Sequence, residues 1–123
     1  MAFIEAINRH DIEGIGKVLS DNVTIIFPSL RKIIKEEYLE DFVHEFEALN
    51  SKLRIDSIVS KDNTVALEYY WWGEHRKEYH GRPATGKSLE CPGAFFFELK
   101  DNKIKVIKYY WNPSLVFDKP PTR

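Results

Sequence analysis

The sequence predicts an α+β fold in which a cone-shaped, curved antiparallel sheet wraps around one long helix. Apolar residues recur every three or four positions in the first half of the chain, and they alternate with a period of two from residue 53 onward. Helices that precede a run of antiparallel strands are typical of α+β domains. Because the 123 residues contain no internal repeat or linker, we expect one domain over residues 1–123.

The first half is expected to contain two short helices, a strand and the long helix. Apolar residues at positions 3, 4 and 7 predict a first helix, and Asp11 is expected to cap a second helix over residues 12–19. A β-branched run over residues 23–27, ended by Pro28, predicts a strand. The long helix is predicted over residues 34–49, with an apolar stripe on one face and most of its acidic residues facing away.

Four strands are expected in the second half. Their predicted ranges are 53–59, 65–72 with an extension toward His75, 94–99 and 104–111. The sequence Lys-Asp-Asn separates the first two, and Asp101-Asn102 suits a tight hairpin turn between the last two. Such a sheet around a helix leaves an apolar cavity between them, which is the usual form of a small-molecule site.

Residues 81–88, GRPATGKS, match the phosphate-binding pattern G-x-x-x-x-G-K-[ST]. That loop binds phosphate only where it leads from a buried strand into a helix N-terminus. Here Pro92 and Gly93 prevent a helix of useful length, and the residues that follow predict a strand. We therefore expect a connection between antiparallel strands and no nucleotide site.

Charge and cysteine content exclude several classes of function. The net charge of −1 and the pI near 6.4 do not suit nucleic acid or an anionic membrane, and no segment resembles a membrane span. The single cysteine, Cys91, favours a reducing, cytoplasmic location. His75 and His80 are expected on opposite faces of extended backbone, so neither a metal site nor a cofactor is predicted.

The second half of the chain resembles the SnoaL-like polyketide cyclase family of the NTF2-like superfamily. The resemblance rests on Gly73-Glu74-His75, the hairpin of residues 81–87, the turn of residues 101–104, and Trp111-Asn112. Residues 5–28 also resemble the family's first helices and strand. It implies the same fold and a pocket for a small, mostly apolar or polycyclic molecule. It also implies cofactor-free acid–base catalysis of the isomerase, cyclase or hydratase type.

The sequence departs from that family where its chemistry would be. Asn112 stands where the cyclases resembled here carry an acid on the last strand, and phenylalanines stand where they use a His on the strand before it. The related ketosteroid isomerases use an Asp before a Pro, at a position that is Phe27 here. Two functions therefore stay open: a cofactor-free enzyme, or a non-catalytic ligand-binding or dimerisation module.

Candidate site residues follow from the expected cavity. His75 is in phase with an apolar strand face and suits proton transfer, and the amide of Asn112 could orient a carbonyl or a water molecule. The candidate ligand-binding residues are aromatic side chains of the helix and strands: Phe27, Tyr38, Phe42, Phe46, Tyr69, Trp71, Phe95, Phe97 and Tyr110.

The outer face of the sheet is expected to be an interface. Tyr70 and Trp72 alternate with the inward residues, and Trp111 is expected to join them. An exposed aromatic patch of that size is rare on a monomer. We therefore expect a homodimer formed through the outer sheet face.

Overall fold

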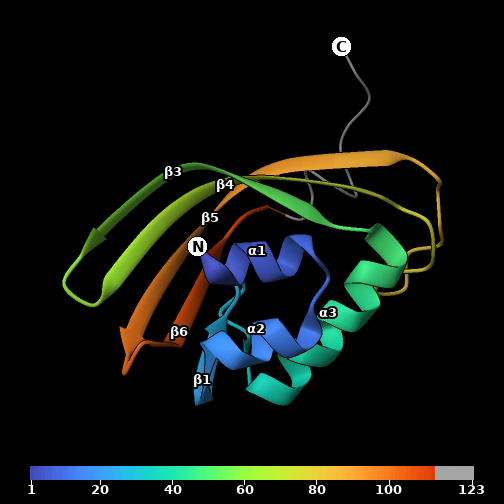
Figure 1. Cartoon of the computed structure of the whole chain (residues 1–123). Coiled ribbons are helices and arrows are strands. Elements are labelled where there is room, and N and C mark those ends of the chain that lie inside the picture. Colours follow the sequence, from blue (N-terminus) through green and yellow to red (C-terminus); the bar gives the residue numbers. More distant parts are fainter. Residues whose placement is uncertain (113–123) are drawn as a thin grey trace.

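A computed structural model describes residues 1–112, and in it a curved, open sheet wraps around the helix α3 (Figure 1). Two short helices precede the sheet on its concave side. The elements are α1 (Ala2–Asn8), α2 (Ile12–Val18), β1 (Leu19–Ile26), β2 (Lys32–Ile33), α3 (Lys35–Leu49), β3 (Lys52–Lys61), β4 (Thr64–Glu74), β5 (Ser88–Lys100) and β6 (Lys103–Tyr110). The predicted α+β class and the long central helix are therefore confirmed.

The six strands lie in the order β2-β1-β6-β5-β4-β3. All neighbouring strands are antiparallel except β1 and β6, which are parallel. The predicted antiparallel sheet needs this one correction. A parallel pair requires a long crossover between its strands, and here the whole of α3 and the meander β3–β5 lies between them. Because β2 and β3 remain as edges, the sheet does not close into a barrel.

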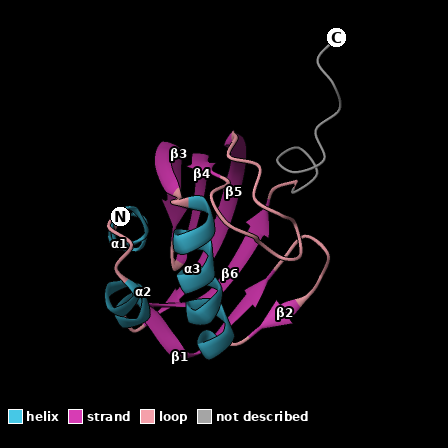
Figure 2. Cartoon of the chain, turned by 90° about the vertical axis from the view of Figure 1, so that its right-hand side faces the viewer, coloured by secondary structure: helices cyan, strands magenta, loops and turns pink. Residues whose placement is uncertain are grey.

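The core fills the space between the concave sheet face and the three helices. Figure 2 shows α3 crossing the sheet, with α1 and α2 beside it. Phe3 of α1 packs edge-on against Phe95 and Phe97 of β5, with ring centroids 5.8 and 5.6 Å apart. Ile15, Ile25, Phe97 and Ile107 are fully buried. Burial of these side chains is what fixes the helices on the sheet.

Two local predictions at turns and caps are confirmed. Asp11 caps α2, because its side chain accepts a hydrogen bond of 2.9 Å from the Gly14 amide. The β5–β6 turn has positive φ at both Asp101 (52°) and Asn102 (62°). Positive φ at both positions is the signature of a type I′ hairpin, whose twist matches that of the flanking strands.

Residues 81–88 connect two antiparallel strands, as predicted. β4 ends at Glu74, and Ser88 already begins β5, so no helix follows the glycine-rich stretch. Gly81 (φ 79°) and Gly86 (φ 70°) occupy the left-handed region that glycine favours. A phosphate cradle in front of a helix N-terminus is therefore not formed here.

A bulge in β6 changes which of its residues face inward. Leu99 pairs with Ile104 but Glu98 pairs with Val106, so Lys105 has no partner of its own on β5. Because of the extra residue, Ile107 and Tyr109 face inward together with Ile104, although they lie an odd number of positions away from it. Trp111, which was expected on the outer face, consequently lines the cavity described below.

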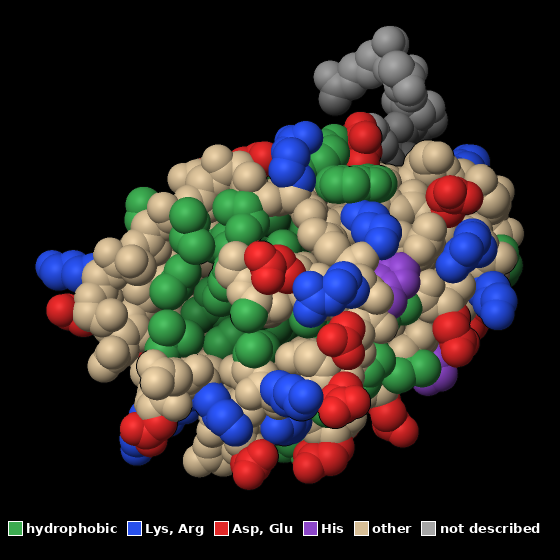
Figure 3. Space-filling model, in the orientation of Figure 1, with side chains coloured by type: hydrophobic (Ala, Val, Ile, Leu, Met, Phe, Trp, Pro, Cys, Tyr) green, Lys and Arg blue, Asp and Glu red, His purple; other side chains and the backbone are tan. Residues whose placement is uncertain are grey.

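One face of the molecule carries an apolar area (Figure 3). Hydrophobic side chains gather between α1 and the β3–β4 hairpin, and charged side chains are scattered over the rest of this view (Figure 3). Ile58 and Val59 of β3 are 50% and 64% exposed. Within residues 1–112, none of the helices is both long enough and apolar enough to cross a bilayer.

Candidate functional site

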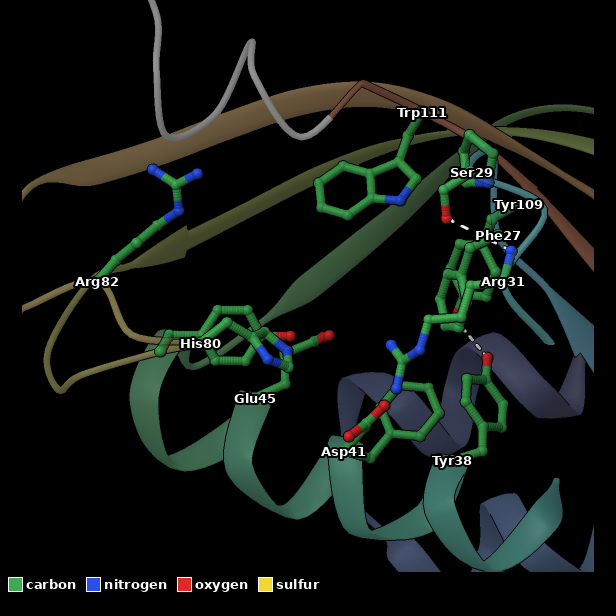
Figure 4. Close-up of a pocket in the computed structure, with 13 residues that line it drawn as sticks. Phe27, Ser29, Arg31, Tyr38, Asp41, Glu45, His80, Arg82, Tyr109 and Trp111 are labelled. Carbon is green, nitrogen blue, oxygen red and sulfur yellow. Dashed lines mark hydrogen bonds between the residues drawn. The ribbon is translucent and has the colours of Figure 1, made fainter. Parts of the chain in front are cut away.

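A cavity of about 430 Å³ opens between α3 and the concave side of the sheet. A smaller space of about 50 Å³ adjoins it toward the core and shares five of its lining residues. The lining of the larger cavity comes from the segment after β1, from α3, from the β4–β5 connection and from the end of β6 (Figure 4). Those residues are Phe27, Pro28, Ser29, Arg31, Tyr38, Asp41, Phe42, Glu45, Tyr79, His80, Arg82, Tyr109 and Trp111.

One face of α3 supplies the chemistry of the cavity. Tyr38, Asp41, Phe42 and Glu45 follow one another at spacings of three, one and three residues, which places all four on the same side of the helix. The sequence predicted most acidic residues of this helix to face away from the apolar stripe. Asp41 and Glu45 are exceptions, because they lie at the edge of that stripe and turn toward the cavity.

Glu45 is the most perturbed acid of the site. Its side chain is half-buried, and burial raises its pKa from 4.5 to about 7. The Ser51 hydroxyl beside it lowers that pKa, the negative charge of Asp41 raises it, and a hydrogen bond from Tyr79 lowers it. A carboxyl group with a pKa near 7 exists in both protonation states at neutral pH, which is what a proton-transfer group requires.

The raised pKa predicts a pH-dependent stability. Between about pH 4.5 and 7 the native protein holds a proton on Glu45 that the unfolded chain has lost, so the free energy of unfolding falls as pH rises. Glu45→Gln removes the free-energy cost of ionising this carboxyl group in the folded protein. We expect the variant to be more stable than the parent at pH 8 by about 1–3 kcal/mol, since partial exposure reduces the full effect. At pH 4 urea denaturation should give equal stabilities, and a gain of the same size at both pH values would contradict the assignment.

A pair of tyrosines forms the wall next to β6. The hydroxyl groups of Tyr38 on α3 and Tyr109 on β6 hydrogen-bond to each other. Burial raises the pKa of both phenols well above the usual value, so both stay protonated at neutral pH. Phe27 stacks on Tyr109 with ring centroids 5.1 Å apart and makes this wall flat and aromatic.

The β4–β5 connection covers the other end of the cavity. Tyr79 and Arg82 exchange two backbone hydrogen bonds of 3.0 Å, and the carboxyl group of Glu78 accepts a 2.6 Å bond from the Gly81 amide. This small turn brings Tyr79 over α3, where its hydroxyl donates to Glu45. Burial raises the pKa of Tyr79, so the phenol stays a neutral donor.

The predicted ligand-binding residues fall into four groups. Phe27, Tyr38 and Phe42 line the larger cavity, and Tyr69, Trp71 and Phe95 line the inner space together with Phe42. Phe46 and Phe97 are buried outside both, and the ring of Phe46 stacks on His10 at 4.2 Å. Tyr110 is 57% exposed, on the outer side of the sheet, while its neighbour Tyr109 faces inward.

The two predicted catalytic residues lie outside both cavities. His75 is buried at the end of β4, where its Nδ1 lies 3.3 Å from Thr85 Oγ1. Its backbone carbonyl accepts from the Gly86 amide and its own amide donates to the Lys87 carbonyl. Asn112 is exposed at the end of the described chain. Their catalytic roles stay predictions, and neither side chain is brought together with Glu45.

Sequence reasoning missed the polar residues of the cavity. Asp41 and Glu45 were not singled out among the acidic residues of the helix, most of which were expected to face away from its apolar stripe. Tyr79, His80 and Arg82 lie in a connection without a regular period. For the two acidic residues, the available signal was their helical spacing from Tyr38 and Phe42 on α3. Within residues 1–112, no group of three or more His, Cys, Asp or Glu side chains is placed to hold a metal ion.

Comparison with known proteins gives one family and many similar folds. A family model described as "SnoaL-like domain" matches residues 1–107. No curated protein matches the chain in sequence.

Solved structures agree with this fold at low sequence identity. AclR from Streptomyces galilaeus, provisionally assigned as a hydroxylase, has a TM-score of 0.85 and 22% identity, covering 98% of this chain and 83% of its own. A provisionally assigned polyketide cyclase from Xanthomonas campestris has a TM-score of 0.84 and 24% sequence identity, and the match covers 92% of this chain and 87% of the cyclase. IdmH from Streptomyces antibioticus, also provisionally assigned as a polyketide cyclase, has a TM-score of 0.83 and 18% sequence identity. The match covers 96% of this chain and 92% of IdmH.

Proposed function

Because this chain belongs to the SnoaL-like domain family, we propose that its cavity binds a small, mostly apolar molecule and that Glu45 transfers a proton to and from it. No cofactor takes part in this proposal. The observation that carries it is a half-buried carboxyl group with a pKa of about 7 in a cavity walled mainly by aromatic rings. Perturbed acids in clefts are characteristic of catalytic sites.

The proposed reaction is the movement of a proton beside a carbonyl group. The Glu45 carboxylate accepts a proton from the carbon next to the carbonyl, and the C–H electron pair forms a carbon–carbon double bond. The π electrons of the carbonyl group move to its oxygen. Return of the proton from the neutral Glu45 carboxyl to a conjugated carbon gives isomerisation. If the carboxyl proton first exchanges with solvent, its return to the original carbon gives hydrogen exchange, and in both cases atoms and charges balance.

The bicyclic ketone 1-tetralone is a suitable probe of this reaction. In D₂O, the protein is expected to accelerate the exchange of the hydrogens next to its carbonyl, followed by proton NMR. The rate should rise with pH to a plateau, with a midpoint near 7, because the base form of Glu45 is the active one. A rate equal to that of buffer at every pH would contradict the proposal.

The non-catalytic ligand-binding module remains the alternative function. It is favoured by the departures on the last strand, where Asn112 stands in place of the family acid and its side chain is exposed. Under that alternative, 1-tetralone or a related molecule binds in the cavity without exchange. The same experiment therefore separates the two functions.

We further propose that two copies of the chain pack through the outer sheet face. Trp72 and Tyr110 are 43% and 57% exposed there. Large exposed apolar patches are rare on monomeric proteins and often mark an interface. Sedimentation should give twice the chain mass of 14.5 kDa. Trp72→Glu should sediment as a monomer, whereas Val43→Glu on the exposed side of α3 should not change the mass. A monomeric parent protein would refute this interface.

A further inference from the structure

Ser51 carries a fully buried hydroxyl group at the corner between α3 and β3. Its oxygen makes no hydrogen bond of ordinary geometry within residues 1–112. It nevertheless lies close enough to the Glu45 carboxyl group to act on it as a hydrogen-bond donor. Because buried hydroxyls in native proteins almost always have a partner, the Glu45 carboxylate is the acceptor that this corner offers to Ser51.

The side chain of Glu45 reaches the same corner of the fold. Leu49, one helical turn after Glu45, comes two residues before Ser51, and Leu53 comes two residues after it. Glu45, Leu49 and Leu53 all line the small inner space next to the cavity. Figure 4 shows Glu45 at the end of the cavity beside the β4–β5 connection. The proximity of Ser51 and Glu45 therefore follows from the path of the chain out of α3.

Side-chain hydrogen bonds fix this corner to the end of α1. Nε2 of His10 donates to the Ser51 carbonyl oxygen over 2.8 Å. The Asn8 side chain donates to the Leu53 carbonyl oxygen (2.9 Å) and accepts from the Leu53 amide (2.7 Å). The ring of His10 also stacks on Phe46 of α3, with centroids 4.2 Å apart. One imidazole therefore contacts both α3 and the segment that carries the buried hydroxyl.

We propose that the Ser51 hydroxyl donates to the Glu45 carboxylate and stabilises the base form, and that His10 holds Ser51 in place for this contact. Ser51 and His10 are positioning residues, because they act on a substrate only through Glu45. The inference rests on the proposed proton transfer by Glu45 and states how that group is regulated. A hydroxyl donor favours a carboxylate over its neutral form, so it opposes the effect of burial and lowers the pKa of Glu45.

Other groups that act on Glu45 stay in place when Ser51 is changed. Asp41 of α3 raises the pKa of Glu45, and the Tyr79 hydroxyl of the β4–β5 connection lowers it. Further charged or titratable side chains line the two cavities, namely Arg31, Tyr38, Tyr69, His80, Arg82, Cys91 and Tyr109. Replacing Ser51 removes no charge, so a changed midpoint of Glu45 reports the lost hydroxyl.

The experiment compares Ser51→Ala with the parent by carbon-13 titration of the Glu45 carboxyl group and by 1-tetralone exchange. The Glu45 signal is identified by its absence in Glu45→Gln. The midpoint should lie higher in Ser51→Ala, since one donor to the charged form is lost. At pH 6 exchange should be about two- to tenfold slower than in the parent, as the loss of one hydrogen bond allows. At pH 9, where the base form predominates in both, the rates should agree within about a factor of two. A purely structural loss would instead lower the rate at both pH values and leave the midpoint unchanged.

His10→Phe tests the second part of the inference. The phenyl ring keeps the size needed to stack on Phe46 but cannot donate to the Ser51 carbonyl group. The midpoint of Glu45 should therefore rise, by less than in Ser51→Ala, because the hydroxyl is still present but less well held. Two matched controls at exposed positions should keep the parental midpoint: Ser60→Ala on β3 and His44→Phe on α3.

An unchanged or lower midpoint in Ser51→Ala overturns the role of the hydroxyl, and a parental midpoint in His10→Phe overturns the role of His10. If Ser51→Ala does not fold, His10→Phe decides, and a parental midpoint there refutes the whole inference. Failure of the proposed function gives a different result. A higher midpoint in Ser51→Ala, in a protein that does not accelerate exchange, refutes the catalysis and leaves the contact between Ser51 and Glu45 standing.

Discussion

Glu45→Gln is expected to slow the exchange of 1-tetralone hydrogens catalysed by this protein by about 10²–10⁴-fold, the usual contribution of a general base. The amide keeps the size of the side chain and can still accept a hydrogen bond from Tyr79, but it cannot take up a proton near neutral pH. The raised pKa is what makes Glu45, rather than the other acids of α3, effective at pH 7.

The matched control for this experiment is Glu47→Gln, two residues further along the same helix. Glu47 is exposed and does not line the cavity, so the variant should retain the parental rate. Binding of 1-tetralone should be similar in both variants, which separates loss of chemistry from loss of the cavity. An exchange rate in Glu45→Gln within a factor of two of the parent would show that another group moves the proton.

Phe97→Ala is expected to have the largest effect on stability, a loss of about 3–5 kcal/mol in the free energy of unfolding. The ring of Phe97 is fully buried. It packs against Phe3 and Phe95 with centroids 5.6 and 5.2 Å apart, which joins α1 to the sheet. Its removal leaves a cavity between α1 and the sheet. Urea denaturation followed by circular dichroism measures the loss.

Phe96→Ala provides the comparison on the neighbouring residue of β5. Phe96 is only partly buried and lies on the opposite face, where Lys108 contacts its ring. Its truncation should cost less than half as much, since little packed volume is lost. Equal losses at positions 96 and 97 would mean that the concave side of the sheet is not the main core.

Hydrophobic periodicity was sufficient to predict the helices and strands, but not to predict which residues of every strand face inward. The stripe of Tyr38, Phe42 and Phe46 predicted α3, and the alternation around Tyr69 predicted β4 and its concave face. In β6 the same reasoning failed at one residue, because the bulge at Lys105 is not visible in an alternating pattern. It moved Tyr109 and Trp111 to the cavity and Tyr110 away from it.

The polar part of the site depends on contacts between segments far apart in the sequence. Whether Glu45 faces solvent or the cavity is decided by the turn that carries Tyr79, 34 positions later, and by Ser51 beside it. A helical wheel places Glu45 at the margin of the apolar stripe and leaves both positions open. The pairing of Tyr38 with Tyr109 likewise follows only from the fold, because 71 residues separate them.

Titration of the Glu45 carboxyl group by carbon-13 NMR tests the central claim most directly. With glutamate labelled at the side-chain carboxyl carbon, the signal that disappears in Glu45→Gln identifies the residue, and the signal of Glu47 serves as the reference in the same spectra. We predict a midpoint of about 7 for Glu45, which should change when 1-tetralone is added. A midpoint between about 4 and 5, the ordinary range of an exposed glutamate, would contradict the proposed proton transfer.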